Sequence, residues 1–214
     1  MRNLLTFRRD PLNPLDAPFY LRVLFLIALG AGVVAFERFV LKRQTRRASE
    51  YVFLVGCALV GAAFGVLNDQ ITCSISPEYF VLGKEIDAGD GFRWRVAALG
   101  AKAGVCAGAI AGGTLLISNT LGFLKPAREL RALWRFTVPP LALAVLGAGV
   151  GSVAFPPLLS SAFIEGIEPD ARPSFLAVWG VHLGLYAGAT LGLLVASLRL
   201  RFSASPAKEP PSVS

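Results

Sequence analysis

Long apolar segments alternate with short polar connections along most of this chain. Five stretches are apolar over about 17 residues or more, the minimum for a helix that crosses a bilayer. They are 19–41, 51–67, 95–118, 136–159 and 174–198. Lipid offers no partner for backbone N–H and C=O groups, so each span must be helical. Transmembrane β-strands would need segments of about ten residues with alternating polarity, which this sequence lacks. The pattern therefore predicts an all-α integral membrane protein with about five transmembrane helices.

Polar segments lie on both sides of this apolar region. We expect a polar leader at 1–18, a single transmembrane domain at 19–202, and a disordered tail at 203–214 that is rich in Ser, Pro and Ala. The leader is too long for the charged start of a cleavable signal peptide, so we expect no such peptide. Pro139 and Pro140 fall near the start of the fourth span, where proline is tolerated because first-turn N–H groups lack partners.

Composition narrows the class of protein further. Hydrophobic residues make up 54% of the chain and charged residues 16%, against about 25% charged in soluble domains. The net charge of +7 does not indicate nucleic-acid binding, because the basic residues cluster at the ends of apolar spans instead of forming one patch. The three cysteines show no C-x-x-C spacing, which argues against a zinc ribbon or a disulfide framework. We expect no cofactor and no nucleic-acid partner.

Lysine and arginine concentrate in alternate connections. The basic segments are 42–47, 119–135 and the one that follows the last span, whereas most acids fall in 68–94 and 160–173. Basic connections stay in the cytoplasm. The sequence thus predicts a bacterial inner-membrane protein with a cytoplasmic C-terminus and an external 68–94 loop. This topology puts Arg8 and Arg9 outside, against the same rule, so a four-span protein with 19–41 lying along the membrane surface is the alternative.

Glycines recur at every fourth position in two spans. They are Gly100, Gly104, Gly108 and Gly112 in the third span, and Gly180, Gly184, Gly188 and Gly192 in the fifth. Small residues at this spacing let a neighbouring helix backbone approach closely. The preceding spans share an Ala-x-x-Gly-Ala-x-x-Gly pattern at 58–65 and 144–151. We interpret the last four spans as a parallel two-helix repeat. The same glycine faces are candidate contacts for a second copy or for other membrane helices.

A polar stretch, 68–80, combines acids, an amide, hydroxyls and aromatics directly after the second span. The repeat aligns Lys102 with His182, roughly 10–12 Å below the outer surface. Ionisable groups inside spans are costly and usually face the bundle interior or a wet cavity. We therefore expect an outward-facing polar ligand site, and the candidates are Asp69, Gln70, Thr72, Glu78, Tyr79, Lys102, His182 and Tyr186.

Each of these residues also has a structural explanation. Lys102 can extend its stem to the interface or pair with Asp69, and His182 can hydrogen-bond between helices, a contact worth about 1 kcal/mol. Asp69 can cap a helix end, and the aromatics beside Glu78 can anchor at the interface. A metal bound by Asp69, Glu78 and His182 is chemically reasonable, since mixed N and O ligands suit zinc or manganese. No H-x-x-x-H or H-E-x-x-H spacing supports it.

An uncharacterised family of bacterial multi-pass membrane proteins carries a motif that this stretch resembles. The family motif, G-x-L-H-D-Q-V-T followed by P-E-Y-F-T, is similar to 65–72 and 77–81 here. A second family motif, A-H-x-x-S-Y-x-x-G-x-x-G-G, resembles the residues that begin at Val181. Asn68 stands in place of the family's usual His and Val81 in place of its Thr. The first change weakens a metal or proton-relay interpretation, and the resemblance implies a site without a known activity.

Three functional hypotheses follow. The leading one is binding or transport of a small solute or ion through the outward-facing polar site. The second is a membrane-embedded enzyme that uses the same residues for metal-assisted or acid–base chemistry, although no nucleophile elbow or phosphate loop is present. The third is a non-catalytic assembly protein whose glycine faces bind other membrane helices.

Overall fold

The computed structural model of this protein describes residues 18–42, 46–120, 128–158, 164 and 166–202. Within these ranges the chain forms helices, turns and loops without any strand. Five helices are long and apolar enough to cross a membrane, which confirms the all-α, multi-pass prediction. The chain divides into two compact units, Met1–Tyr51 and Val52–Ser214. The tail and all of the leader except Pro18 lie outside the described residues.

The first unit contains α1 (Phe19–Phe39) and the start of α2 (Arg47–Ile75). The hydroxyl of Tyr51 donates to the carbonyl of Ile27 at 2.9 Å, which ties the start of α2 to the middle of α1. Glu37 is buried and accepts a hydrogen bond from Arg47. This contact joins the end of α1 to the start of α2.

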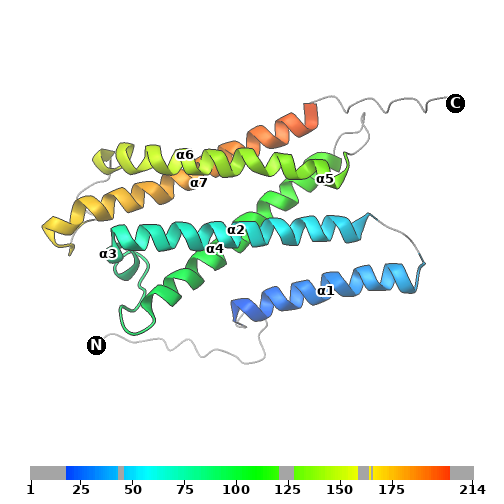
Figure 1. Cartoon of the computed structure of the whole chain (residues 1–214), viewed down its shortest axis with the longest axis horizontal. Coiled ribbons are helices and arrows are strands. Elements are labelled where there is room, and N and C mark those ends of the chain that lie inside the picture. The colour runs from blue at the N-terminus through cyan, green and yellow to red at the C-terminus, as the bar shows by residue number, and fades with distance from the viewer. Residues whose placement is uncertain (1–17, 43–45, 121–127, 159–163, 165, 203–214) are drawn as a thin grey trace, which may run out of the picture. The chain divides into compact units, whose positions relative to one another are not determined.

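The second unit contains two hairpins of long helices, drawn in Figure 1. The first hairpin pairs α2 with α4 (Phe92–Thr120) through the short helix α3 (Pro77–Val81). The second pairs α6 (Val138–Ala154) with α7 (Arg172–Phe202). The shorter elements are α5 (Leu130–Leu133) and the 3-10 turns η2 (Trp134–Thr137), η3 (Pro156–Leu158) and η5 (Pro169–Ala171).

Facing glycines bring the two helices of each hairpin into backbone contact. A methyl group on any of them would overlap the backbone of the opposite helix. The facing pairs are Gly61 with Gly104, Gly65 with Gly100, Gly147 with Gly184, and Gly151 with Gly180. Lipid tails are as apolar as leucine, so close van der Waals contact of this kind, and not the hydrophobic effect, holds helices together in a bilayer.

The polar loop expected directly after Leu67 does not begin there, because α2 continues to Ile75. A helix need not stop where the hydrocarbon stops, and the hydroxyl of Thr72 donates to the carbonyl of Asn68 at 2.8 Å within the extra turns. The helix ends at Ser76, which has an extended backbone. A proline disfavours helical geometry in the residue before it, and Pro77 follows directly. Asn68 and Asp69 are therefore helical residues.

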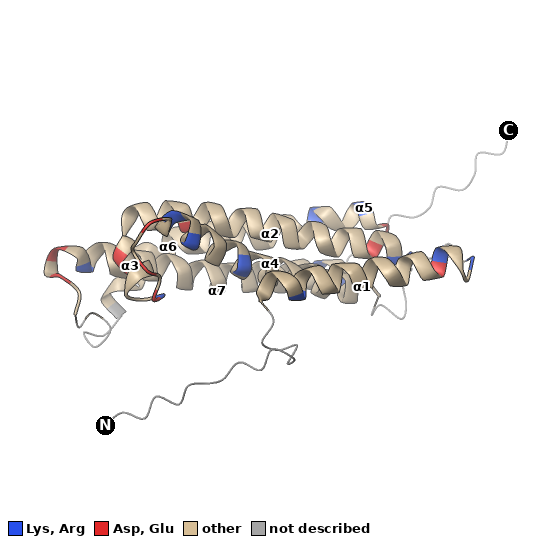
Figure 2. Cartoon of the chain, turned by 90° about the horizontal axis from the view of Figure 1, so that it is seen from below, with Lys and Arg blue, Asp and Glu red and all other residues tan. Residues whose placement is uncertain are grey.

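Packed side chains close both ends of the second unit. A cluster around Phe80 and Phe175 joins α3, α4 and α7 at one end. A cluster around Phe53 and Leu115 joins α2, α4, α5 and α7 at the other. Figure 2 shows that the charged residues gather toward the ends of these helices and are sparse between them. The predicted proline position is also found, because α6 carries proline in its first turn.

Two glycine-to-alanine substitutions on α6 and α7 test the glycine contact. Gly184→Ala should lower the free energy of unfolding by about 1–3 kcal/mol, because its methyl group overlaps the α6 backbone. Gly149→Ala is the matched control, since nothing lies within 4 Å of its Cβ position. It should be neutral or stabilising by up to about 1 kcal/mol through higher helix propensity. Thermal unfolding in detergent measures both, and equal effects would contradict the backbone contact.

Candidate functional site

A buried acid–imidazole pair joins the two hairpins of the second unit. Asp69 on α2 and His182 on α7 are 7% and 5% exposed, and Asp69 Oδ1 lies 3.2 Å from His182 Nε2. The amide nitrogen of Asn68 donates to the same carboxylate oxygen at 3.1 Å. Ionisable groups are expensive inside a membrane protein and usually mark a functional position. This pair is therefore the centre of the candidate site.

Hydrogen bonding fixes one proton on His182 Nδ1 and places a second proton between Nε2 and Asp69. His182 Nδ1 is 2.9 Å from the carbonyl oxygen of Val178, and because a carbonyl only accepts, Nδ1 must carry a proton. Nε2 then faces a carboxylate oxygen, and two acceptors can approach this closely only with a proton between them. That shared proton belongs to the ring or to the carboxyl group. With that proton in place, the pair carries no net charge.

Aromatic rings of α3 cover the imidazole. The ring of Tyr79 stacks on His182 with centroids 4.7 Å apart and planes inclined by 23°, and Phe80 presents its edge at 6.1 Å. Burial raises the pKa of the Tyr79 phenol, and nearby Tyr186 and Asp69 raise it further. The phenol therefore stays neutral, so α3 places no negative charge over the imidazole.

A glycine of α4 makes room for the carboxylate. A Cβ on Gly100 would lie 2.9 Å from Asp69 Oδ2 and would also overlap the backbone of α2. Because the helix surface is smooth here, Asp69 reaches past α4 and toward α7. The glycine packing that forms the hairpin thus also positions the acid of the site.

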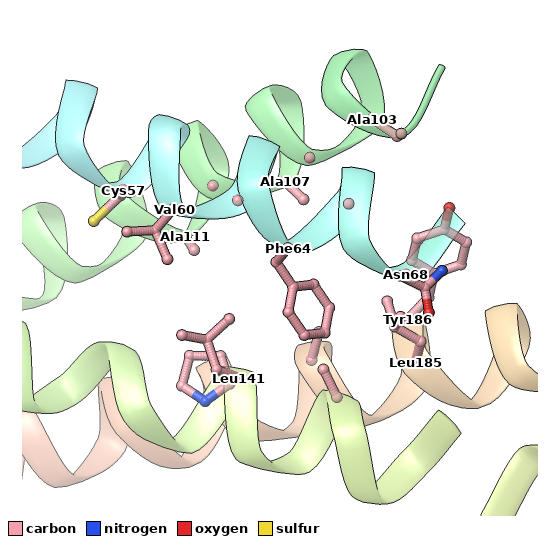
Figure 3. A pocket seen from close by; sticks show the side chains of 18 of the residues that line it. Cys57, Val60, Phe64, Asn68, Ala103, Ala107, Ala111, Leu141, Leu185 and Tyr186 are labelled. Carbon is pink, nitrogen blue, oxygen red and sulfur yellow. The ribbon is translucent and has the colours of Figure 1, made fainter. Parts of the chain in front are cut away.

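An apolar crevice of about 140 Å³ opens beside the pair and runs between the hairpins. Figure 3 shows Phe64 pointing from α2 toward the opposite hairpin, with Asn68 and Tyr186 at one end of the crevice. Asp69 and His182 line that same end. The opposite end is lined by Cys57 and Trp134. A cavity of this size and apolar character holds a group about as large as benzene.

The structure brings together four of the predicted site residues. Asp69 pairs with His182, Tyr79 stacks on the imidazole, and Tyr186 lines the crevice with half of its surface exposed. His182 and Tyr186 are one turn apart on α7, which places them on the same side of the helix.

Three other predicted residues form hydrogen bonds away from the acid–imidazole pair. The amide of Gln70 donates to the carbonyl of Arg93 at 3.0 Å. Thr72 donates to the backbone of its own helix. Glu78 accepts a hydrogen bond from the hydroxyl of Ser76 at 2.9 Å. These contacts give Gln70, Thr72 and Glu78 structural roles, and the expected approach of Glu78 to His182 does not occur.

Lys102 does not join the site. Its side chain is exposed on α4, and the described residues provide it with no ion pair to Asp69. The expected charge balance fails because His182 itself neutralises the acid, which leaves Lys102 free to face outward. The metal candidates Asp69, Glu78 and His182 do not converge. Among the described residues no group of three or more His, Cys, Asp or Glu side chains could hold a metal ion.

Sequence reasoning missed two residues of this region. Asn68 belongs to the polar stretch but is not among the predicted site residues, yet its amide contacts Asp69 and lies 3.4 Å from His182 Nε2. Phe64 lines the crevice one helical turn away. Val60, Phe64 and Asn68 are spaced four residues apart, which places them on one face of α2. This spacing is the sequence pattern that indicates that Phe64 and Asn68 share a surface.

Comparisons with known protein families, with curated proteins and with solved structures find no match. The family resemblance of the 65–81 stretch therefore stays a prediction. The site rests on its own geometry.

His182 is the single histidine of the chain, which makes it a direct spectroscopic reporter. In nitrogen-15 NMR of histidine-labelled protein in nanodiscs, Nδ1 should be protonated in both the wild type and Asp69→Asn, because Val178 accepts from it. Nε2 should change from a nitrogen that shares a proton to a pure acceptor in Asp69→Asn. Lys102→Ala should leave both signals unchanged. An Nε2 signal that is the same with and without the carboxyl group would contradict the shared proton.

Proposed function

We propose that this multi-pass membrane protein binds a small solute or ion at the Asp69–His182 pair and carries it between the two hairpins. The observation that carries this proposal is the pair itself, which is buried, 3.2 Å long and formed by one residue from each hairpin. A ligand or proton that changes the charge of either partner alters the contact between the hairpins. Binding and packing are therefore linked at one position.

The arrangement of the hairpins supports transport as the form that this binding takes. Corresponding glycines face each other in both hairpins, which favours the parallel repeat expected from the sequence. Transporters built from such repeats bind their substrate at the interface between the repeats and work by rocking one repeat against the other. The crevice beside Asp69 and His182 lies at this interface.

We place the protein in a bacterial inner membrane with the Asp69 end of the helices outward. The basic segments around Arg131 and Arg199 lie at the opposite end, where the cytoplasmic positive charge is expected. This orientation makes the 68–94 segment external and the C-terminus cytoplasmic. A ligand from outside then reaches the pair past α3.

An acid–base enzyme is the second candidate, and one observation favours it. The Val178 carbonyl fixes the imidazole so that Nε2 points at a carboxyl group, which is the orientation that an acid–base residue needs. A non-catalytic assembly role is the third candidate. The glycine faces already contact their partner helices within each hairpin, so a second copy or another membrane helix would need a different surface.

A thermal-shift screen of the purified protein against small solutes, ions and amphiphiles tests the proposal. A compound at about one hundred times its Kd should stabilise the fold by about 2.7 kcal/mol. That stabilisation should be lost in Asp69→Asn and His182→Ala. Lys102→Ala is the matched control because this ionisable residue faces away from the site, and it should respond like the wild type.

Flux of the same compound into proteoliposomes completes the test. The wild type and Lys102→Ala should transport it, and Asp69→Asn should not. Stabilisation and flux that both survive Asp69→Asn and His182→Ala would refute this function.

A further inference from the structure

We infer that the ligand of this site is a membrane amphiphile with one aliphatic chain and an uncharged, hydrogen-bonding head group. This inference rests on the proposed function and names the class of ligand. The head group would meet Asn68, Tyr186 and the Asp69–His182 pair, and the chain would run along the apolar crevice, whose volume of about 140 Å³ encloses only part of it. The argument comes from the length, lining, exposure and charge of the crevice.

The length of the crevice matches one leaflet of a bilayer. Its lining on α2 extends from Cys57 to Asn68, which corresponds to about 16 Å along a helix. Half of a hydrocarbon core is about 15 Å deep. α2 is 29 residues long, or about 44 Å, so each end reaches about 7 Å beyond that core. Asp69 lies about 9 Å from the end of α2, which puts the polar end of the crevice near the hydrocarbon boundary.

The crevice is accessible from its side. Three of its lining residues are partly exposed on the membrane-spanning helices or beside them: Val60 at 42%, Trp134 at 39% and Tyr186 at 50%. Lipid surrounds such helices, so an aliphatic chain can enter laterally. Alanines and glycines of α4 form much of one wall. The narrow space that these small residues leave suits a single chain.

Charge determines the class of head group. Among the described residues that line the crevice there is no lysine or arginine, so an anionic head group would have no counter-ion. Asp69 is already neutralised by His182, so a cationic head group gains no free carboxylate. The Tyr186 hydroxyl and the side-chain amide oxygen of Asn68 have no hydrogen bond among the described residues, and both residues lie at this end. A hydroxyl-bearing head group, as in a monoacylglycerol, fits these groups.

Fluorescence quenching of Trp134 by brominated amphiphiles tests this inference. Trp94→Phe and Trp179→Phe leave Trp134, at the deep end of the crevice, as the sole tryptophan of the three in the chain. In nanodiscs, monoacylglycerol brominated near the chain end should quench Trp134 saturably. The same lipid brominated next to the head group should quench much less, because that end meets Asn68 and Tyr186.

Two alanine-to-leucine variants of α4 provide the matched pair. Ala107 lines the crevice and Ala98 does not, and both are exposed. Ala107→Leu should weaken saturable quenching about tenfold or more by occupying the space of the chain. Ala98→Leu should bind as the parent does. Quenching that does not saturate, or that is equal in the two variants, would overturn the proposed chain site.

The head group and the proposed function have separate readouts. Brominated stearate, whose head group is anionic, should quench much more weakly than the monoacylglycerol, and equal or stronger quenching overturns the uncharged head group. If Ala107→Leu blocks quenching but Asp69→Asn does not, the polar end is wrong and the chain site is supported. If a solute still requires Asp69 and His182 while no amphiphile binds, the proposed function stands and this inference fails.

Discussion

Close contact between helix backbones is the constraint on which the rest of this structure depends. In a bilayer there is little hydrophobic gain when apolar helices associate, so packing must come from short-range contact. Glycines such as Gly104 and Gly184 remove the side chains that would separate the helices. Each hairpin thereby becomes a closely packed pair. The acid–imidazole pair and the crevice lie between the two hairpins.

The acid–imidazole pair is stable in this apolar setting because its hydrogen bonds are nearly complete. Asp69 receives the Asn68 amide and faces His182, while the second ring nitrogen donates to the Val178 carbonyl. A buried pair of this kind contributes little net stability, but breaking it leaves an uncompensated buried charge that is strongly unfavourable. A ligand that changed the charge of either partner would therefore weaken the contact between the hairpins, and the proposed function needs this link between binding and packing.

The crevice changes the chemical character expected of the ligand. The sequence suggested a polar vestibule, whereas the space next to the pair is largely apolar and polar only at the end of Asn68 and Tyr186. Lys102, which would have supplied a permanent positive charge, is exposed on α4. A site with a neutral polar end and an apolar remainder is complementary to an amphiphile that already resides in the membrane. Partition into lipid would deliver such a ligand to the exposed side of the crevice.

The sequence by itself determined the helical class, the five long apolar helices and the proline position in α6, because lipid forces backbone hydrogen bonds to be satisfied within each span. It also singled out Asp69, which lies in the polar stretch after the second span, and His182, because ionisable residues are rare inside membrane spans. Only the tertiary structure decided which groups meet. Helix rotation and the turn at Ser76 decide that Asp69 pairs with His182 and that Lys102 faces outward. They also decide that Glu78 accepts a hydrogen bond from Ser76. Helix rotation is set by contacts between residues far apart in the chain, and a one-dimensional pattern does not contain those contacts.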